Sequence, residues 1–262
     1  MPVLSIDDAG DPRLADYQGI PEPELARARG VFVAEGRLVV RRLLASRFTT
    51  RSVMVTPAVL DTVRADLEGH PCLPVFVVPQ GLMNSVAGFN MHRGCLALAE
   101  RPREASLSTA MLQAVNRLLV IEGVNNPDNI GGLFRSAAAF GVDLVVLGPG
   151  CGDPLYRKAI RTSMAAALQV PFVYAGEWPG ALTLLRSNGL RVVALTPAAD
   201  AQSLADLPSD RRRIALLAGA EGDGLTADAM AAADERVRIP IAVHVDSLNV
   251  TVAVSIALFQ LR

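Results

Sequence analysis

Hydrophobic positions between residues 115 and 262 follow two alternating patterns. Short, nearly continuous apolar runs are typical of strands that are buried on both faces. Such runs lie at Leu118–Glu122, Leu144–Leu147, Phe172–Tyr174, Val192–Leu195, Ile214–Ala218 and Arg236–Ile239. Apolar residues at helical spacing lie between them, in the segments Gly132–Phe140, Leu155–Ala167, Gly180–Ser187, Thr226–Ala233 and Leu248–Leu261. This alternation predicts an α/β fold with a mostly parallel sheet, whose ligands bind beyond the carboxyl ends of the strands.

The region before residue 115 shows a shorter alternation of the same kind. From Glu22 to about Ala99 the pattern indicates helix, strand, helix and strand in turn. The definite elements are Val31–Ala34, Gly36–Ala45, Ser52–Thr56, Pro57–Leu67, Val75–Val78 and Cys95–Ala99. Charged residues and proline gather at Glu100–Glu104, which is typical of a linker. We therefore predict an irregular lead-in over 1–20, a small α/β domain over 21–100, a linker over 101–114 and a larger α/β domain over 115–262.

Composition places the chain among soluble globular proteins. Hydrophobic residues make up 51% and charged residues 19% of its 262 residues, which is enough apolar material for a buried core. No apolar run is long enough to span a membrane, and the acidic N-terminus lacks the apolar stretch of a signal peptide. The three cysteines lie far apart and have no metal-ligand spacing with histidine. We expect a cytoplasmic protein without a metal site or a membrane partner.

Three widespread catalytic or nucleotide-binding motifs are missing from the sequence. The glycines of Gly148–Gly152 lack the G-x-G-x-x-G spacing, and the single lysine, Lys158, precedes alanine rather than serine or threonine. No serine stands in G-x-S-x-G. A dinucleotide-binding dehydrogenase, a P-loop nucleoside triphosphatase and an α/β-hydrolase are therefore disfavoured.

Polar residues gather instead in three loops at predicted strand ends. The segment Asn125–Arg135 reads N-N-P-D-N-I-G-G-L-F-R; alone, it is compatible with a helix cap and a surface arginine. The segment Ala218–Leu225 reads A-G-A-E-G-D-G-L; it is compatible with an ordinary turn, although glycine also lets a flat ligand lie against the backbone. The segment Asp246–Thr251 reads D-S-L-N-V-T after an Ile239–Pro240 pair, and helix capping explains only one of its polar residues.

Taken together, in order and in spacing, the three loops resemble the signature motifs of the SpoU/TrmH family of RNA 2′-O-ribose methyltransferases, within the SPOUT superfamily. The resemblance covers about residues 115–262. A shorter motif, F-V-A-E-G at Phe32–Gly36, resembles the small substrate-binding domain of that family, which is akin to an RNA-binding ribosomal protein. Ile241, Val243 and Ala165 depart from the family pattern, in which Met, Gly and Gly are frequent at these positions.

The resemblance implies a fold, a cofactor and an assembly. The C-terminal domain would contain a deep trefoil knot that binds S-adenosyl-L-methionine, with the active site at the interface of a homodimer. The implied cofactor-binding residues are Gly219, Ile239, Leu248, Leu195 and Thr196. The implied catalytic residues are Arg135, Asn129, Glu221, Ser247 and Asn249.

Arg135 has the clearest expected role. A guanidinium is effectively always protonated, so it is a poor free base. We expect Arg135 to clamp a substrate phosphate beside the target ribose and to stabilise negative charge on the attacking oxygen. Asn129 would orient Arg135 or the ribose, while Glu221 and its partners in the third loop would hold the loops and the hydroxyl by hydrogen bonds.

Basic residues are concentrated in the N-terminal domain, although the formal net charge of the chain is −1. Eight arginines lie between Arg27 and Arg64, against two acidic residues, Glu35 and Asp61. Such a local excess is typical of a nucleic-acid-binding surface, with a solvated helix face as the alternative. The expected RNA contacts are Arg37, Arg41 and Arg42, extended by Arg157 and Arg161.

The sequence therefore predicts an S-adenosylmethionine-dependent RNA ribose-2′-O methyltransferase. Ribosomal RNA is the expected substrate because of the additional N-terminal domain, and transfer RNA is the alternative. Two alternative interpretations are a non-catalytic RNA-binding protein of the same fold and a methyltransferase of the same fold that modifies a base. Methyl transfer from labelled cofactor and analysis of nuclease-resistant dinucleotides distinguish these possibilities.

Overall fold

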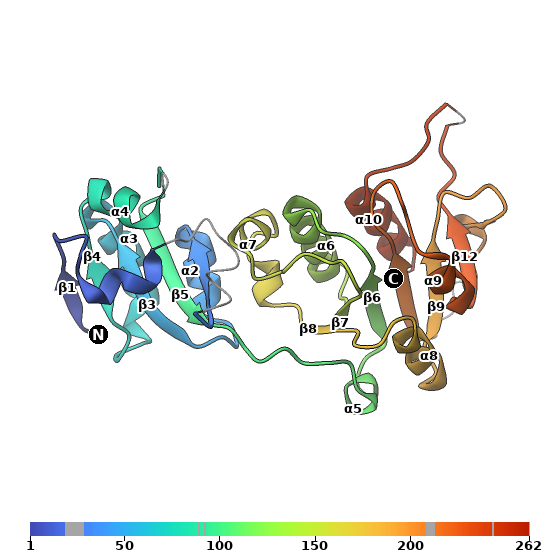
Figure 1. Ribbon diagram of the computed structural model, residues 1–262, viewed down its shortest axis with the longest axis horizontal. Coiled ribbons are helices and arrows are strands. Elements are labelled where there is room, and N and C mark those ends of the chain that lie inside the picture. The colour runs from blue at the N-terminus through green and yellow to red at the C-terminus, as the bar shows by residue number, and fades with distance from the viewer. Residues whose placement is uncertain (19–28, 89, 92, 208–212, 243, 262) are drawn as a thin grey trace. The chain divides into compact units, whose positions relative to one another are not determined.

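The computed structural model describes residues 1–18, 29–88, 90–91, 93–207, 213–242 and 244–261. The helix expected from Glu22, together with Arg27 and Val243, lies outside the described residues. The chain divides into two compact units: Met1–Arg103 with Leu155–Gln169, and Glu104–Pro154 with Val170–Arg262. Each unit is built around its own β-sheet (Figure 1).

The first unit contains a mixed five-stranded sheet with the strand order β1-β4-β3-β5-β2. Its strands are β1 (Val3–Ser5), β2 (Val31–Glu35), β3 (Thr50–Val55), β4 (Val75–Val77) and β5 (Cys95–Glu100). Strand β5 runs in the direction opposite to the other four strands of this sheet. The helices are η1 (Pro12–Tyr17), α2 (Arg37–Leu44), α3 (Pro57–Glu68), α4 (Gln80–Ala87), α7 (Arg157–Thr162) and η2 (Ala166–Leu168). Buried aliphatic and aromatic side chains from both ends of this sequence range fill one core.

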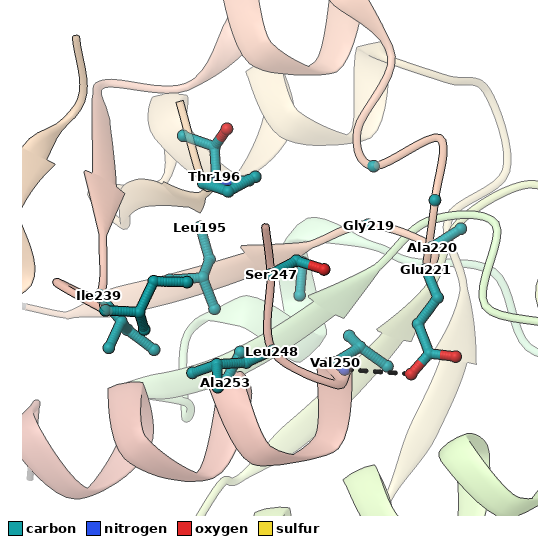
Figure 2. Close-up of a pocket in the computed structure, with 15 residues that line it drawn as sticks. Leu195, Thr196, Gly219, Ala220, Glu221, Ile239, Ser247, Leu248, Val250 and Ala253 are labelled. Carbon is teal, nitrogen blue, oxygen red and sulfur yellow. Dashed lines mark hydrogen bonds between the residues drawn. The ribbon is translucent and has the colours of Figure 1, made fainter. Parts of the chain in front are cut away.

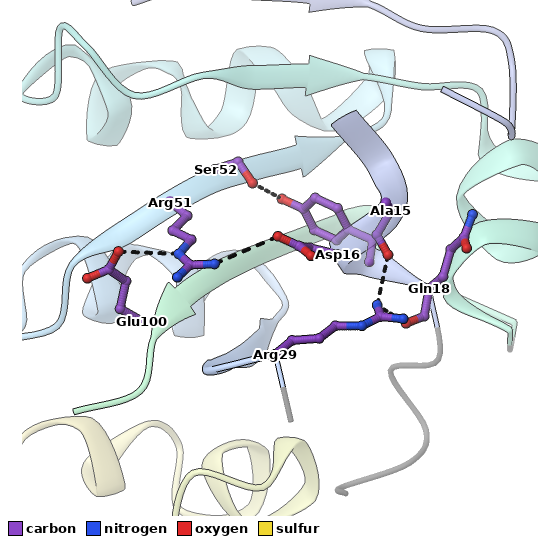
Figure 3. A network of polar contacts seen from close by, with 8 residues as sticks. Ala15, Asp16, Gln18, Arg29, Arg51, Ser52 and Glu100 are labelled. Atoms are coloured by element: carbon purple, nitrogen blue, oxygen red, sulfur yellow. Dashed lines mark hydrogen bonds and ion pairs between the residues drawn. The ribbon is translucent and has the colours of Figure 1, made fainter. Parts of the chain in front are cut away.

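The first 18 residues differ from the expected irregular lead-in. Strand β1 pairs in parallel with β4, and η1 buries Leu14 and Tyr17 completely. The Tyr17 hydroxyl shares a 2.9 Å hydrogen bond with Ser52, and burial raises the pKa of this phenol, so it stays uncharged. Arg51 lies 3.8 Å from Asp16 and 3.3 Å from Glu100 (Figure 3). A three-residue strand carries no readable alternation, and its partner strand is distant in the chain.

The second unit contains a parallel seven-stranded sheet with the order β10-β12-β9-β11-β6-β7-β8. Its strands are β6 (Arg117–Ile121), β7 (Leu144–Leu147), β8 (Phe172–Tyr174), β9 (Arg191–Leu195), β10 (Gln202–Ser203), β11 (Ile214–Ala218) and β12 (Glu235–Arg238). The helices are α5 (Thr109–Leu112), α6 (Pro127–Ala139), α8 (Gly180–Ser187), η3 (Leu204–Asp206), α9 (Ala227–Ala232) and α10 (Val250–Gln260). The expected α/β fold with a mostly parallel sheet is confirmed.

Two expected helices differ in extent from those in the structure. Helix α6 begins at Pro127 rather than Gly132, because the Asn126 side chain caps it by accepting a 2.8 Å hydrogen bond from Asp128 N. The helix expected over 155–167 breaks after α7, where Met164 and Ala165 have φ angles of 52° and 64°. Residues other than glycine rarely adopt this left-handed backbone conformation, and it ends the helix.

Part of the expected linker is attached to the second unit. Ala105 O accepts a 2.9 Å hydrogen bond from Tyr174 N, and Leu107 N donates a 2.9 Å hydrogen bond to Tyr174 O. Ser106 lies between them in a parallel bridge to Tyr174. The linker therefore covers the outer edge of β8, the last strand of the sheet, with backbone hydrogen bonds.

Helices α6 and α10 lie side by side in the second unit (Figure 1). A Cβ at Gly132 would lie 2.6 Å from Thr251 Cγ2, and the hydroxyls of Ser136 and Ser255 are 2.7 Å apart, so small residues allow the close approach. Three apolar residues of α10 that share a face remain exposed, namely Val252, Ile256 and Phe259. No described helix is long and apolar enough to cross a membrane.

Candidate functional site

Three loops meet at the carboxyl edge of the seven-stranded sheet. The first loop, Gly123–Asn126, follows β6 and leads into α6. The second loop, Gly219–Leu225, follows β11, and the third loop, residues 239–249, follows β12 and leads into α10. Because all strands of this sheet are parallel, their carboxyl ends lie along one edge, which brings the polar residues of distant segments together.

The side chain of Asn249 joins the third loop to the second loop and to α6. Its Nδ2 donates a 3.0 Å hydrogen bond to Asn129 Oδ1 in the first turns of α6, and a second hydrogen bond to Glu221 Oε1 in the second loop. Its Oδ1 accepts from the backbone N–H of Thr251 at 2.9 Å and so caps α10. Glu221 Oε1 also accepts from Val250 N at 3.4 Å. These contacts form the Asn249 network, in which one amide links the start of α10 to α6 and to the second loop.

A pocket lies beside this network, between the end of β9 and the second and third loops (Figure 2). Its walls are largely aliphatic, and glycine backbone lines one side. The lining residues are Leu195, Thr196, Pro197, Ala218, Gly219, Ala220, Glu221, Gly222, Gly224, Ile239, Ile241, Ser247, Leu248, Val250 and Ala253. Aliphatic walls with exposed backbone groups suit a flat, partly polar small molecule.

The second loop is folded so tightly that glycine is required at its first position. A Cβ at Gly219 would lie 2.3 Å from the carbonyl carbon of Gly224 and 2.4 Å from Leu225 N. Gly224 N donates a 3.2 Å hydrogen bond to Ala220 O, which closes the loop on itself. Gly222 and Gly224 have φ angles of 90° and 71°, a conformation that glycine adopts without strain. The missing side chain of Gly219 therefore makes room for the loop's own backbone.

The structure brings most of the expected site residues together. All five expected cofactor residues line the pocket, namely Leu195, Thr196, Gly219, Ile239 and Leu248. Of the expected catalytic residues, Glu221 and Ser247 line the pocket, while Asn129 and Asn249 belong to the Asn249 network.

Arg135 lies apart from the pocket. It is exposed on α6, it is not among the lining residues, and it has no hydrogen-bond or ion-pair partner within the described part of the chain. Its guanidinium is therefore available to an incoming anion.

Sequence reasoning did not identify Val250 and Ala253 as pocket residues. They are three positions apart at the start of α10, so they share one helix face. The apolar residues at this spacing directly after the S-L-N run could have indicated that this face lines the pocket. Sequence reasoning also placed Glu122 at the end of a strand and gave it no role in the site, although its side chain is buried beside the second loop.

Among the described residues, neither an activated thiol beside the first loop nor a metal site is present. Burial raises the pKa of the Cys151 thiol to about 11, so this residue beside the first loop stays protonated at neutral pH. No group of three or more histidine, cysteine or acidic side chains there could hold a metal ion. The polar side chains that line the pocket, Glu221 and Ser247, can form hydrogen bonds with a ligand.

The expected basic residues of the first unit have different surroundings. Arg37 is exposed, and Arg41 is exposed with its Nε 3.1 Å from Asp66. Arg42 is half-buried and donates a hydrogen bond to Met164 O. Their predicted interaction with RNA stays a prediction.

Arg157 and Arg161 share a buried carboxylate. Glu35 is 6% exposed and pairs with Arg157, whose side chain is 19% exposed, while Arg161 Nη1 lies 3.8 Å from the same carboxylate. The expected open basic surface is therefore partly neutralised at Arg157, because an acidic residue distant in the sequence lies against it.

Known proteins resemble this chain over nearly its whole length. The profile of the SpoU rRNA methylase family matches residues 116–259. An uncharacterized tRNA/rRNA methyltransferase of Mycobacterium bovis is 42% identical, covering 98% of this chain and 91% of that protein. The 23S rRNA (guanosine-2′-O-)-methyltransferase RlmB of a Burkholderia species is 32% identical, covering 85% and 92%. The crystal structure of an AdoMet-bound rRNA methyltransferase from Sinorhizobium meliloti has a TM-score of 0.83 at 22% identity, covering 99% and 97%.

Replacement of Asn249 by alanine tests the Asn249 network. The change removes the cap of α10 and the links to α6 and to the second loop, so we expect the free energy of unfolding to fall by about 1–2 kcal/mol. Ser247→Ala is the matched control, because Ser247 lies in the same loop and makes no hydrogen bond with the described residues; its effect should stay within about 0.5 kcal/mol. Urea unfolding of both variants measures the difference, and equal stabilities would contradict the network's role.

Proposed function

The chain belongs to the SpoU rRNA methylase family, and we propose that it transfers the methyl group of S-adenosyl-L-methionine to a ribose 2′-hydroxyl of RNA. The observation that carries this proposal is that the five expected cofactor residues, from three separate strand ends, line one pocket beside the Asn249 network. Ribosomal RNA is the proposed substrate because the Burkholderia relative acts on 23S rRNA. The reaction would take place in the cytoplasm.

The lining of the pocket fits S-adenosyl-L-methionine. Leu195, Ile239 and Leu248 supply aliphatic surface for a purine, and the tight second loop presents backbone rather than side chains. When bound, the cofactor supplies a methyl group activated by a positively charged sulfur. The exposed carboxylate of Glu221 and the hydroxyl of Ser247 lie at the same pocket, where they would bind polar groups of the cofactor or of the ribose.

We also propose that the C-terminal segment is threaded into a trefoil knot. The second and third loops enclose the same pocket, and the chain returns after β12 to pack α10 against α6, far earlier in the sequence. Such threading is rare among folds. It would hold the loops in place by chain topology as well as by the Asn249 network.

Arg135 is the proposed electrostatic catalyst. The ribose hydroxyl oxygen bonds to the methyl carbon as the carbon–sulfur bond breaks, and the hydroxyl proton must leave. The permanently charged guanidinium of Arg135 would hold the neighbouring phosphate of the RNA, place the hydroxyl in line and stabilise the negative charge that develops on its oxygen. In this arrangement the phosphate is the proposed proton acceptor.

A homodimer would complete this site. Val252, Ile256 and Phe259 form an exposed apolar stripe on α10, with exposed fractions of 47%, 40% and 49%. Isolated exposed apolar residues are ordinary, but three on one face of a helix favour an interface. Because α10 packs against α6, a symmetric dimer through this stripe would place Arg135 of α6 close to the interface.

The first prediction concerns the chemical step. Arg135→Ala should leave the dissociation constant for S-adenosyl-L-methionine nearly unchanged and lower turnover by about two orders of magnitude or more, because the variant no longer stabilises charge in the transition state. Arg186→Ala is the control, since the Arg186 side chain forms a surface pair with Asp234 in the described part of the chain. Calorimetry and methylation of ribosomal RNA with labelled cofactor measure both quantities. Loss of cofactor binding with turnover preserved at saturation would refute the assignment.

The second prediction concerns the dimer. Ile256→Glu places a charge in the centre of the stripe, and we expect it to convert a dimer into a monomer at equal concentration, because an unpaired charge resists burial. Met111→Glu is the control, since Met111 is an exposed apolar residue of α5, outside the stripe. Sedimentation equilibrium measures the molecular mass. A monomeric wild-type protein, or a variant that stays dimeric, would argue against this interface.

The third prediction concerns RNA affinity. Replacement of both Arg37 and Arg41 by Gln should weaken RNA binding and flatten the dependence of log affinity on log salt by up to about 1 unit for each RNA phosphate that the variant no longer neutralises. The control replaces Arg186 and Arg236 by Gln, which changes the net charge equally in the second unit. Filter binding across a salt series measures the slope. Equal slopes for both double variants would remove the two arginines from the proposed RNA surface.

A further inference from the structure

A buried carboxylate outside the expected motif residues holds the second loop. Glu122, directly after β6, is 4% exposed. Its carboxylate accepts three hydrogen bonds: from Trp178 Nε1 at 2.6 Å, from Thr226 N at 2.9 Å and from Thr226 Oγ1 at 2.8 Å. Hydrogen bonds to a charged acceptor are stronger than those between neutral groups. A buried carboxylate with several donors is thus a strong anchor point.

These interactions lie at both ends of the second loop. The backbone N–H of Glu122 donates a 3.0 Å hydrogen bond to Ala218 O, immediately before the loop begins. Its side chain holds Thr226, immediately after the loop ends, and Thr226 caps α9 by accepting from Ala229 N. A single residue therefore sets the distance between the two ends of the loop, and the backbones of Gly219 and Gly224 lie against each other between them.

Trp178 is the third point of attachment. Its indole ring packs against the core of the second unit and passes close to Gly148, where a Cβ would lie 3.3 Å from the ring. Gly148 N in turn donates a 2.7 Å hydrogen bond to Ile121 O, the residue before Glu122. The carboxylate is thereby bonded to a side chain that packs against the core of the second unit.

We propose that Glu122 is a positioning residue for the cofactor: through Thr226 and Trp178 it holds the second loop in the shape that forms one wall of the pocket. Glu122 does not line the pocket itself. Its role differs from that of Glu221, which is exposed on the loop and belongs to the Asn249 network. The inference rests on the proposed function, since it assigns this pocket to S-adenosyl-L-methionine.

The experiment compares Glu122→Ala, Glu122→Gln and Thr226→Val in the full chain. Glu122→Ala leaves the indole N–H and Thr226 N without their acceptor, so the dissociation constant for S-adenosyl-L-methionine should rise by about tenfold or more. Glu122→Gln keeps one acceptor oxygen and should restore part of the affinity. Thr226→Val removes the hydroxyl, which is one of the three donors to Glu122 and also the cap of α9, but it keeps the Thr226 N donor and should weaken cofactor binding less. Turnover at saturating cofactor should stay near the wild-type value, because Glu122 touches no reacting group.

Two further measurements separate positioning from a general loss of stability. Trp178 is the single tryptophan of the chain, so its emission spectrum should shift in the Glu122 variants without interference from other residues. Amide hydrogen exchange in the cofactor-free protein should become faster in residues 219–226 but not in β6 and β11. Glu35→Gln is the matched control, since it changes a carboxylate of similar burial in the first unit and should alter neither measurement.

The outcomes are distinct. Folded Glu122 variants with wild-type cofactor affinity and unchanged exchange in the second loop would overturn the inference. If Glu122→Ala does not fold, Glu122→Gln and Thr226→Val decide in the same way. If the wild-type protein itself does not bind S-adenosyl-L-methionine, the proposed function fails, while the exchange measurement still decides whether Glu122 holds the loop.

Discussion

The amide of Asn249 joins segments that are more than one hundred residues apart in the chain. Its bond to Asn129 reaches across 120 positions, and the same side chain caps α10. The start of the last helix, the start of α6 and the placement of the second loop therefore depend on one another. That arrangement in turn requires α10 to lie close against α6, which the small residues Gly132, Ser136 and Ser255 permit. Packing between two helices thus controls the geometry of polar groups at the sheet edge.

The carboxylates of Glu122 and Glu221 both hold the second loop, in different ways. Glu122 is buried, accepts three hydrogen bonds and anchors the end of the loop to the core. Glu221 is exposed and connects the loop to Asn249. Burial suits the first role, because a desolvated and fully bonded carboxylate makes a rigid anchor. Exposure suits the second, because a group at the pocket must remain accessible to ligands.

The regular part of the fold could be predicted from hydrophobic spacing. The bounds expected for β7, β8 and β11 match the structure, since buried parallel strands form short apolar runs with clear ends. The segments that differ depend on partners outside the local sequence. Strand β1 is defined by its pairing with β4, and the early start of α6 depends on the Asn126 cap rather than on apolar periodicity.

The location of the site could be predicted as far as the parallel arrangement of the strands could be predicted. Residues at the ends of β9, β11 and β12 had to lie along one edge once the sheet was parallel, and Leu195, Gly219 and Ile239 do line one pocket. Pairings across the chain could not be predicted. Glu35 meets Arg157 across 122 positions, and Glu122 meets Thr226 across 104, so neither partner is visible from local spacing.

The linker on the edge of β8 has a consequence for engineering the chain. Residues 105–107 satisfy the backbone groups of the outermost strand, so they protect the sheet from adding a foreign strand and from edge-to-edge aggregation. Added residues or a fusion joint would be tolerated between Pro102 and Ala105, after the backbone hydrogen bond from Arg101 N to Gly30 O and before the bridge to β8. The same insertion two or three residues later would uncover the edge of the sheet. The linker between the two units thus has a first part that tolerates insertions and a second part, residues 105–107, that pairs with β8 like an additional strand.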